Sequence, residues 1–147
     1  MIKFEGLFSR KSPVNFFNDT NSPIGWTVVS HRWVTEKKER RNTHGRWHKI
    51  SSDNGSIYRI LRYSVNLKGS NKTNNGEIVL DWIGWIDLYG REEEVNEPLN
   101  LKIKTVKWWE IIFCGFSHPD PSYRLATLLA VISVGLGVLS VVIAFFL

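Results

Sequence analysis

The sequence predicts a mainly β fold: an antiparallel five-stranded meander, forming a small barrel or curved sheet, followed by one C-terminal transmembrane α-helix. Five runs rich in β-branched and aromatic residues lie between residues 26 and 107, joined by polar loops without a helical crossover. Such a sheet must hide one apolar face, either by curling or by packing on another surface. The final stretch, residues 125–147, contains no charged residue, proline, asparagine or glutamine.

Residues 1–21 are weakly patterned and predict an edge strand or a short helix. Strands are predicted at residues 26–35, 46–52, 56–68, 77–89 and 99–107. The sequence Asp53-Asn54-Gly55 predicts a tight turn between the second and third of these strands. The fourth run alternates, so its apolar side chains are expected on one face, and Asp81 and Asp87 on the solvated face.

The segment 107–116 (KWWEIIFCGF) is dense in apolar side chains and lies just before the C-terminal helix. Three arrangements are open. It can lie against lipid headgroups, where tryptophan is enriched, extend the fifth strand, or pack as a helix across the open end of the sheet. Cys114 is expected to be a buried thiol, with palmitoylation as the alternative. The predicted organisation is a β-rich domain at 1–106, an aromatic juxtamembrane linker at 107–124 and a transmembrane helix at 125–147.

The C-terminal run is long enough to cross a bilayer. A helix over residues 125–147 would be roughly 34 Å long, and a hydrocarbon core is about 30 Å thick. Small residues recur along it at spacings of four and three, which defines a seam on one face. Its members are Ala126, Ala130, Ser133, Gly137, Ser140 and Ala144. Because small residues allow close backbone approach in lipid, this seam predicts association with another copy of the chain or with another membrane subunit.

The charges beside this run predict its orientation. Lys102, Lys104, Lys107 and Arg124 lie on its N-terminal side, and no charged side chain follows it. The positive-inside bias therefore predicts a single-pass, tail-anchored protein whose residues 1–124 are cytoplasmic. No apolar signal-peptide segment is present near the N-terminus. The single cysteine, Cys114, excludes an internal disulfide and fits a reducing compartment.

The net charge of +5 is concentrated in residues 32–49, where seven Lys and Arg residues accompany two Glu residues. This basic stretch can lie on anionic lipid, bind an anionic ligand such as a nucleotide, or be a solvated hairpin tip. For an anionic ligand, arginine forks supply bidentate hydrogen bonds and a tryptophan ring supplies a stacking surface. The candidate binding residues are Arg32, Arg40, Arg41 and Arg46, with Trp33 or Trp47 as the stacking partner.

No short catalytic motif appears in the sequence. It lacks a phosphate-binding loop, a nucleophile elbow, an HExxH pair and paired cysteines at zinc spacing. His44 and His48 are four residues apart, but Gly45 between them favours a loop, so no metal site is predicted even with His31 nearby. The expectation is a binding protein without a cofactor, not an enzyme, with no nucleic acid polymer as a partner.

Two classes of function follow. The first is a membrane sensor-effector, in which the β domain binds a ligand or partner and the transmembrane helices then assemble. This architecture is similar to that of bacterial antiviral-defence effectors that pair a nucleotide-binding β-barrel with membrane helices, although no motif carries the similarity. The alternative is a non-catalytic accessory subunit of a larger membrane protein complex, whose helix packs against that of another protein.

Overall fold

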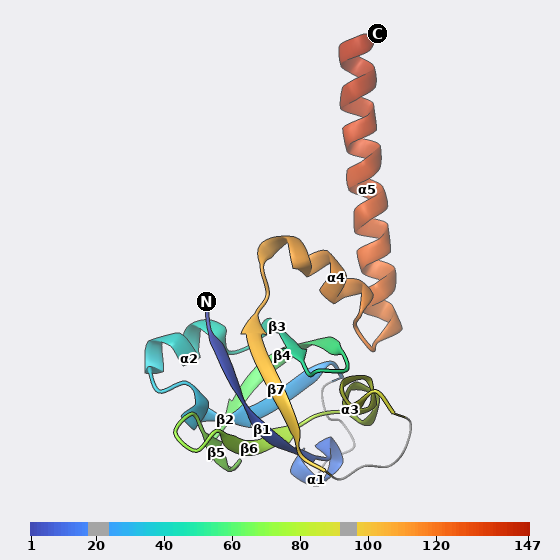
Figure 1. The fold of residues 1–147 in the computed structure, drawn as a ribbon. Coiled ribbons are helices and arrows are strands. Elements are labelled where there is room, and N and C mark those ends of the chain that lie inside the picture. The colour runs from blue at the N-terminus through green and yellow to red at the C-terminus, as the bar shows by residue number, and fades with distance from the viewer. Residues whose placement is uncertain (18–23, 92–96) are drawn as a thin grey trace.

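A computed structural model describes residues 1–17, 24–91 and 97–147 of the chain (Figure 1). The strands are β1 (Lys3–Lys11), β2 (Trp26–Ser30), β3 (Arg46–Ser51), β4 (Ser56–Ser64), β5 (Gly69–Ser70), β6 (Asn75–Val79) and β7 (Leu99–Thr105). The helices are α1 (Pro13–Phe17), η1 (His31–Trp33), α2 (Lys37–Thr43), α3 (Trp82–Tyr89), η2 (Trp108–Glu110), α4 (Ile111–Phe116) and α5 (Pro121–Phe146). The predicted class, a mainly β domain followed by an apolar C-terminal helix, is confirmed.

Six of these strands form a closed barrel. They follow the order β1-β7-β3-β4-β2-β6, and β1 pairs with β6 to close the ring. The two-residue strand β5 lies outside the ring and pairs with the first two residues of β6. Two neighbours, β1 with β6 and β2 with β4, are parallel, and the other pairs around the ring are antiparallel. The strand number and order therefore differ from the predicted five-stranded meander. The N-terminal segment supplies the additional strand, β1, between β6 and β7.

The fourth predicted strand, at residues 77–89, was wrong from residue 80 onward, because β6 ends at Val79 and α3 follows. Asp81 is the N-cap of α3 and its Oδ2 accepts a hydrogen bond from the Gly84 amide at 2.9 Å. Gly90 ends the helix in the left-handed conformation, with φ of 76°. The same residues also fit a helical period, since Trp85 and Leu88 are buried against the barrel.

Asp81 consequently does not lie on a solvated strand face. Its carboxylate pairs with the Arg59 guanidinium, with Nε–Oδ1 at 3.0 Å and Nη2–Oδ2 at 3.2 Å. Arg59 is only 3% exposed, so this pair joins β4 to the start of α3. Burial alone would raise the pKa of Asp81, but the hydrogen bond and charge of Arg59, with the Gly84 amide, outweigh it and lower the pKa.

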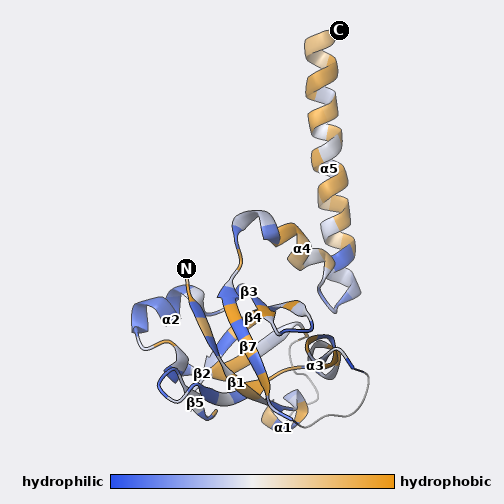
Figure 2. Cartoon of the chain, viewed as in Figure 1, coloured by the Kyte–Doolittle hydropathy of each residue, from blue (hydrophilic) through white to orange (hydrophobic). Residues whose placement is uncertain are grey.

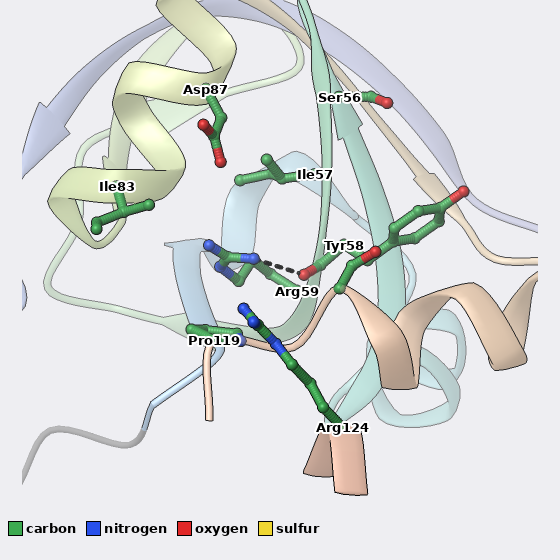
Figure 3. Close-up of a pocket in the computed structure, with 9 residues that line it drawn as sticks. Ser56, Ile57, Tyr58, Arg59, Ile83, Asp87, Pro119 and Arg124 are labelled. Carbon is green, nitrogen blue, oxygen red and sulfur yellow. Dashed lines mark hydrogen bonds between the residues drawn. The ribbon is translucent and has the colours of Figure 1, made fainter. Parts of the chain in front are cut away.

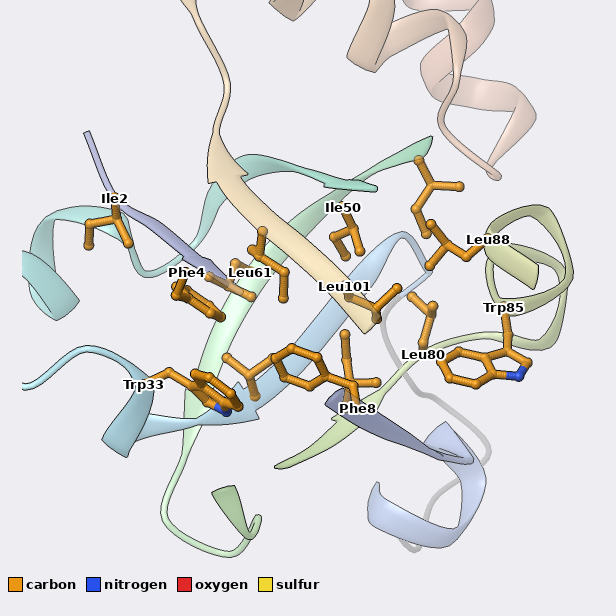
Figure 4. Close-up of a cluster of buried hydrophobic side chains, with 14 of the residues drawn as sticks. Ile2, Phe4, Phe8, Trp33, Ile50, Leu61, Leu80, Trp85, Leu88 and Leu101 are labelled. Atoms are coloured by element: carbon orange, nitrogen blue, oxygen red, sulfur yellow. The ribbon is translucent and has the colours of Figure 1, made fainter. Parts of the chain in front are cut away.

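The barrel interior is filled by apolar side chains (Figure 4). Phe8, Ile50, Leu61 and Leu101 are fully buried there. The first predicted strand, at 26–35, ends at Ser30, and the short η1 turn that follows directs Trp33 inward. The Trp33 ring stacks on Phe8 at a centroid distance of 4.7 Å.

Beyond β7 the chain leaves the barrel. It forms η2 and α4, turns, and continues as the 26-residue α5, which projects away from the barrel (Figures 1 and 2). Asp120 caps α5 and Pro121 occupies its first turn, so the helix begins four residues before the predicted position 125. Among the described residues, α5 is the one helix long and apolar enough to cross a membrane, with a mean hydropathy of 2.7 over an 18-residue stretch.

We expect Asp81→Asn to lower the free energy of unfolding by about 2–3 kcal/mol, because it leaves the buried Arg59 guanidinium without an opposite charge. This is below the cost of breaking a fully buried pair, since the Asp81 side chain is 33% exposed. Because folding lowers the pKa of Asp81, its carboxylate stabilises the folded state fully above its unfolded-state pKa of about 3.9. That stabilisation is lost as the pH falls through the lower pKa of the folded state. The difference between the two proteins in urea unfolding should therefore shrink below about pH 4.

Lys102→Gln is the matched control for this substitution. It removes the Lys102–Glu5 pair, which is 3.7 Å long and exposed on both sides. Such a pair contributes less than about 1 kcal/mol. Equal destabilisation by the two substitutions would contradict the structural role given to the Arg59–Asp81 pair.

Candidate functional site

Two adjoining hollows lie at the α2 side of the barrel. The first, of about 500 Å³, is lined by residues that include His31, Lys37, Arg40, Arg41, His44 and Tyr63. The second, of about 380 Å³, is lined by His31, Arg32, Thr35, Arg40, Ser70 and Lys72. Because His31 and Arg40 line both hollows, the two are neighbours and are described together as one candidate site, here called the basic site.

Arg40 is fixed at the centre of the basic site. Its Nη1 donates a hydrogen bond to the His31 carbonyl oxygen at 3.1 Å, which joins α2 to η1. At the C-terminal end of α2, the Thr43 hydroxyl lies 2.9 Å from the Tyr63 hydroxyl and orients that ring. Burial raises the pKa of Tyr63, so its hydroxyl stays protonated at neutral pH. The His44 ring lies beside it, at a centroid distance of 6.2 Å.

The charge of the basic site has one sign. Lys37 and Arg41 line the first hollow, Arg32 and Lys72 line the second, and Arg40 lines both. Within the described residues, neither hollow is lined by an acidic side chain. A hollow with this lining has a positive potential, and its guanidinium groups match the geometry of phosphate or carboxylate oxygens.

The structure brings together three of the predicted ligand-binding residues, Arg32, Arg40 and Arg41. Arg46 is exposed at the start of β3 and does not line either hollow. Trp33 is 2% exposed, stacked between Phe4 and Phe8 in the core, and is therefore closed to a ligand.

Trp47 also lies outside the basic site, with its ring edge-on to His118 at 5.6 Å. The aromatic ring of the basic site is instead Tyr63. Sequence reasoning missed Tyr63 and Lys72, because β4 and the β5–β6 turn reach the site only through long-range strand pairing. The one local signal was a lysine in a polar loop, which is a common feature of solvated turns.

The three histidines of the basic stretch are not gathered into one site. His31 and His44 line the first hollow, but His48 is fully buried in β3, with Nδ1 2.9 Å from the Arg46 carbonyl oxygen. Burial lowers the pKa of His48 and favours its neutral form. In residues 1–17, 24–91 and 97–147, no group of three or more His, Cys, Asp or Glu side chains could hold a metal ion.

A third hollow, of about 290 Å³, lies where the barrel meets the start of α5 (Figure 3). The Arg59 and Arg124 guanidiniums point toward each other across it, and Asp87 lies on its α3 wall. Arg59 is held by Asp81 and by the Tyr58 carbonyl oxygen at 2.9 Å. Because carboxylates accompany its arginines, this hollow suits an anion less well than the basic site does.

His118 fixes the start of α5 to the barrel. It is 1% exposed, stacks on Tyr123 at 4.0 Å and meets the edge of Trp47. Its carbonyl oxygen accepts a hydrogen bond from Arg124 Nε at 2.8 Å, and its Nδ1 accepts one from the Asp120 amide at 3.0 Å. Burial is the main cause that lowers the pKa of His118, so the packed ring is favoured in its neutral form.

The predicted seam lies along an exposed face of α5. Ser133 and Ser140 donate their hydroxyl hydrogens to carbonyl oxygens of the preceding turn, at 2.8 and 2.9 Å, so neither requires an external partner. A Cβ added at Gly137 would meet no atom within 4 Å, so the seam is open there. Successive residues of a helix are about 100° apart around its axis, so the α5 residues beside α4 face roughly a quarter turn away from the mean direction of the seam. These residues are Thr127, Ala130, Val131 and Val134. The helix α4 therefore flanks the seam, reaches it at Ala130 and leaves its other members uncovered.

The contact between α4 and α5 is close. Any Cβ at Gly115 would collide with the Thr127 side chain, so a residue without a side chain allows the two helices to meet. Cys114, its neighbour, is fully buried, as expected from the sequence.

In comparisons with known proteins, the sequence matches no protein-family model, no curated protein and no solved structure.

Gly115→Val is expected to push α4 away from α5 and to expose Cys114. The thiol should then react several-fold faster with a maleimide than in the wild-type protein, as followed by intact mass. Adding Thr127→Ala, which removes two of the atoms that the new side chain would meet, should partly restore the slow reaction. Equal reaction rates in all three proteins would show that this glycine does not control the α4–α5 contact.

Proposed function

We propose that this chain is a membrane-anchored binding protein, whose β-barrel binds a phosphate-bearing anionic ligand in the basic site. The observation that carries the proposal is the arrangement of Arg32, Arg40 and Arg41 around two hollows that share Arg40. The helix α5 is the proposed bilayer anchor. Lys104, Lys107 and Arg124 on its N-terminal side support a cytoplasmic barrel.

The size and chemistry of the basic site support a small ligand with more than one anionic group. Each hollow falls within the usual range of small-molecule sites, roughly 300–1,000 Å³. Arg41 lines one hollow and Arg32 the other, and Arg40 lines both, so that cations are available to two anionic groups of one molecule. Tyr63 and His44 supply ring faces for a planar group such as a nucleotide base.

On this proposal the protein is a sensor-effector that binds its ligand without catalysing a reaction. Ligand binding at the basic site would bias the assembly of α5 helices through the seam, and a bacterial antiviral-defence effector is one form of such a protein. Support comes from a direct connection between the two regions along one strand. β4 carries Tyr63, which lines the basic site, and four residues earlier Arg59, which lines the hollow with Arg124.

Full-length protein in detergent should bind pyrophosphate or ATP in isothermal titration calorimetry, and Arg41→Gln should weaken that binding about tenfold, equivalent to about 1.4 kcal/mol. Arg46→Gln removes the same charge from the same basic stretch but outside both hollows, and should leave the affinity unchanged. An equal loss in both variants would indicate attraction by net charge alone. Absence of binding by the wild-type protein to either probe would contradict the proposal.

A second candidate function is that of a non-catalytic accessory subunit in a larger membrane protein complex. The observation favouring it is that no part of the hydrophobic stretch of α5 is buried within the chain, although its seam is suited to helix packing. In this case the partner is a helix of another protein rather than a second copy.

Self-association should distinguish the two. If α5 assembles through the seam, the detergent-solubilised wild-type chain forms a defined oligomer in light scattering, and Gly137→Ile yields a smaller species. Gly135→Ile is the matched control, because Gly135 is equally open but lies on the opposite face of the helix. Monomers for all three proteins would favour the accessory subunit, and an oligomer unchanged by Gly137→Ile would remove the seam from the proposal.

A further inference from the structure

We infer that η2 and α4 lie in the same bilayer leaflet as the start of α5, at the boundary between headgroups and acyl chains, which covers their exposed apolar face. The inference rests on the proposed function in one respect, that α5 crosses a bilayer. It adds a second membrane-binding element, and it moves the boundary of the hydrocarbon core along α5.

The first observation is the exposure of this segment. Among its large apolar side chains, Trp108 is 79% exposed and Phe113 is 58% exposed, and the others are between 41% and 53% exposed. The remaining members of this face are Trp109, Ile111, Ile112 and Phe116. Soluble proteins rarely expose a continuous apolar surface of this kind unless it contacts a partner or a membrane.

The second observation is the depth at which α4 lies. Gly115 packs on Thr127, and Ile111 and Ile112 line a surface hollow with Ala130, Val131 and Val134. The helix α4 therefore runs beside residues 127–134 of α5, a rise of about 10 Å. Figure 2 shows apolar colouring on α4 and along most of α5, with a hydrophilic turn between the two helices. Since the two helices are in contact there, the medium around that part of α5 also surrounds α4.

The third observation is the distribution of charge. Residues 111–116 carry no charged side chain, and Lys107 and Glu110 lie at their N-terminal end. The Lys107 ammonium lies 4.7 Å from the centre of the Trp109 ring. A hydrogen bond from the Lys107 amide at 3.0 Å, with nearby lysines, lowers the pKa of Glu110. Lysine and tryptophan together are typical of the headgroup level of a bilayer.

The length of α5 is consistent with this placement. If the hydrocarbon core begins near Ala130, beside α4, the 18 residues from Ala130 to Leu147 are about 27 Å long, slightly less than a core of about 30 Å but within the roughly 17–25 residues typical of transmembrane helices. The turn of α5 before Ala130 then lies among the headgroups with α4, and Arg124 lies nearer the water. The apolar segment of the sequence is longer than needed because its first part pairs with α4.

The distribution of tryptophan offers a direct test. The chain has seven tryptophans: Trp108 and Trp109 lie on η2, and the others lie in residues 26–85, with none in α5. Full-length protein is reconstituted into vesicles whose lipids carry bromine on the acyl chains near the headgroup, and quenching of tryptophan emission is measured. We expect clear quenching of the wild-type protein, and loss of most of it in the double variant Trp108→Phe/Trp109→Phe.

The matched control is Trp26→Phe/Trp82→Phe, which also removes two partly exposed tryptophans but from the barrel, and should retain the quenching. Flotation of the same vesicles separates this inference from the proposed function. If the protein floats with the vesicles but the quenching is the same in the wild-type protein and in Trp108→Phe/Trp109→Phe, the inference is wrong and the membrane anchor stands. Protein that does not float contradicts the membrane anchor as well.

Discussion

The insertion of β1 between β6 and β7 is the constraint on which the rest of the structure depends. Phe4 and Phe8 on β1 enclose the Trp33 ring, and that burial fixes the η1 turn from which α2 begins. The same strand closes the ring of hydrogen bonds, so the barrel has no open edge between β6 and β7. The basic site is assembled around η1 and α2, and therefore its geometry depends on a strand that contributes no residue to it.

Polar and aromatic contacts at helix termini hold α2, α3 and α5 against the barrel. On one side, Arg40 joins α2 to the His31 carbonyl oxygen. On the other, Asp81 caps α3 and pairs with Arg59, while His118 holds the start of α5 against Trp47. The barrel interior is filled with apolar side chains, and the hollows described above lie at the outer surface, near these helix termini.

The apolar C-terminal helix and the β content could be read from the sequence, because both depend on local pattern. The alternating pattern wrongly predicted a strand at Trp82–Tyr89, because its apolar positions also fit a helix. Asp81 at the start and Gly90 at the end of this segment favour the helix. Arg40 and Arg41 were found because they lie on one short helix. Tyr63 and Lys72 were not predicted as site residues, and Trp33 was predicted in the site although it lies in the core. The reason is that the parallel β2–β4 pairing and the closure of the barrel leave no pattern in neighbouring residues.

The position of β7 has a mechanical consequence. This strand leads directly to the segment that joins the barrel to α5, and it is paired along both sides, with β1 and with β3 (Figure 1). Tension between an immobilised α5 and anything that grips the barrel would pull β7 along its own axis. Both ladders would then be loaded in shear, with many hydrogen bonds sharing the force at once. The barrel is thus joined to α5 through a strand that would have to be sheared from two neighbours rather than peeled from one.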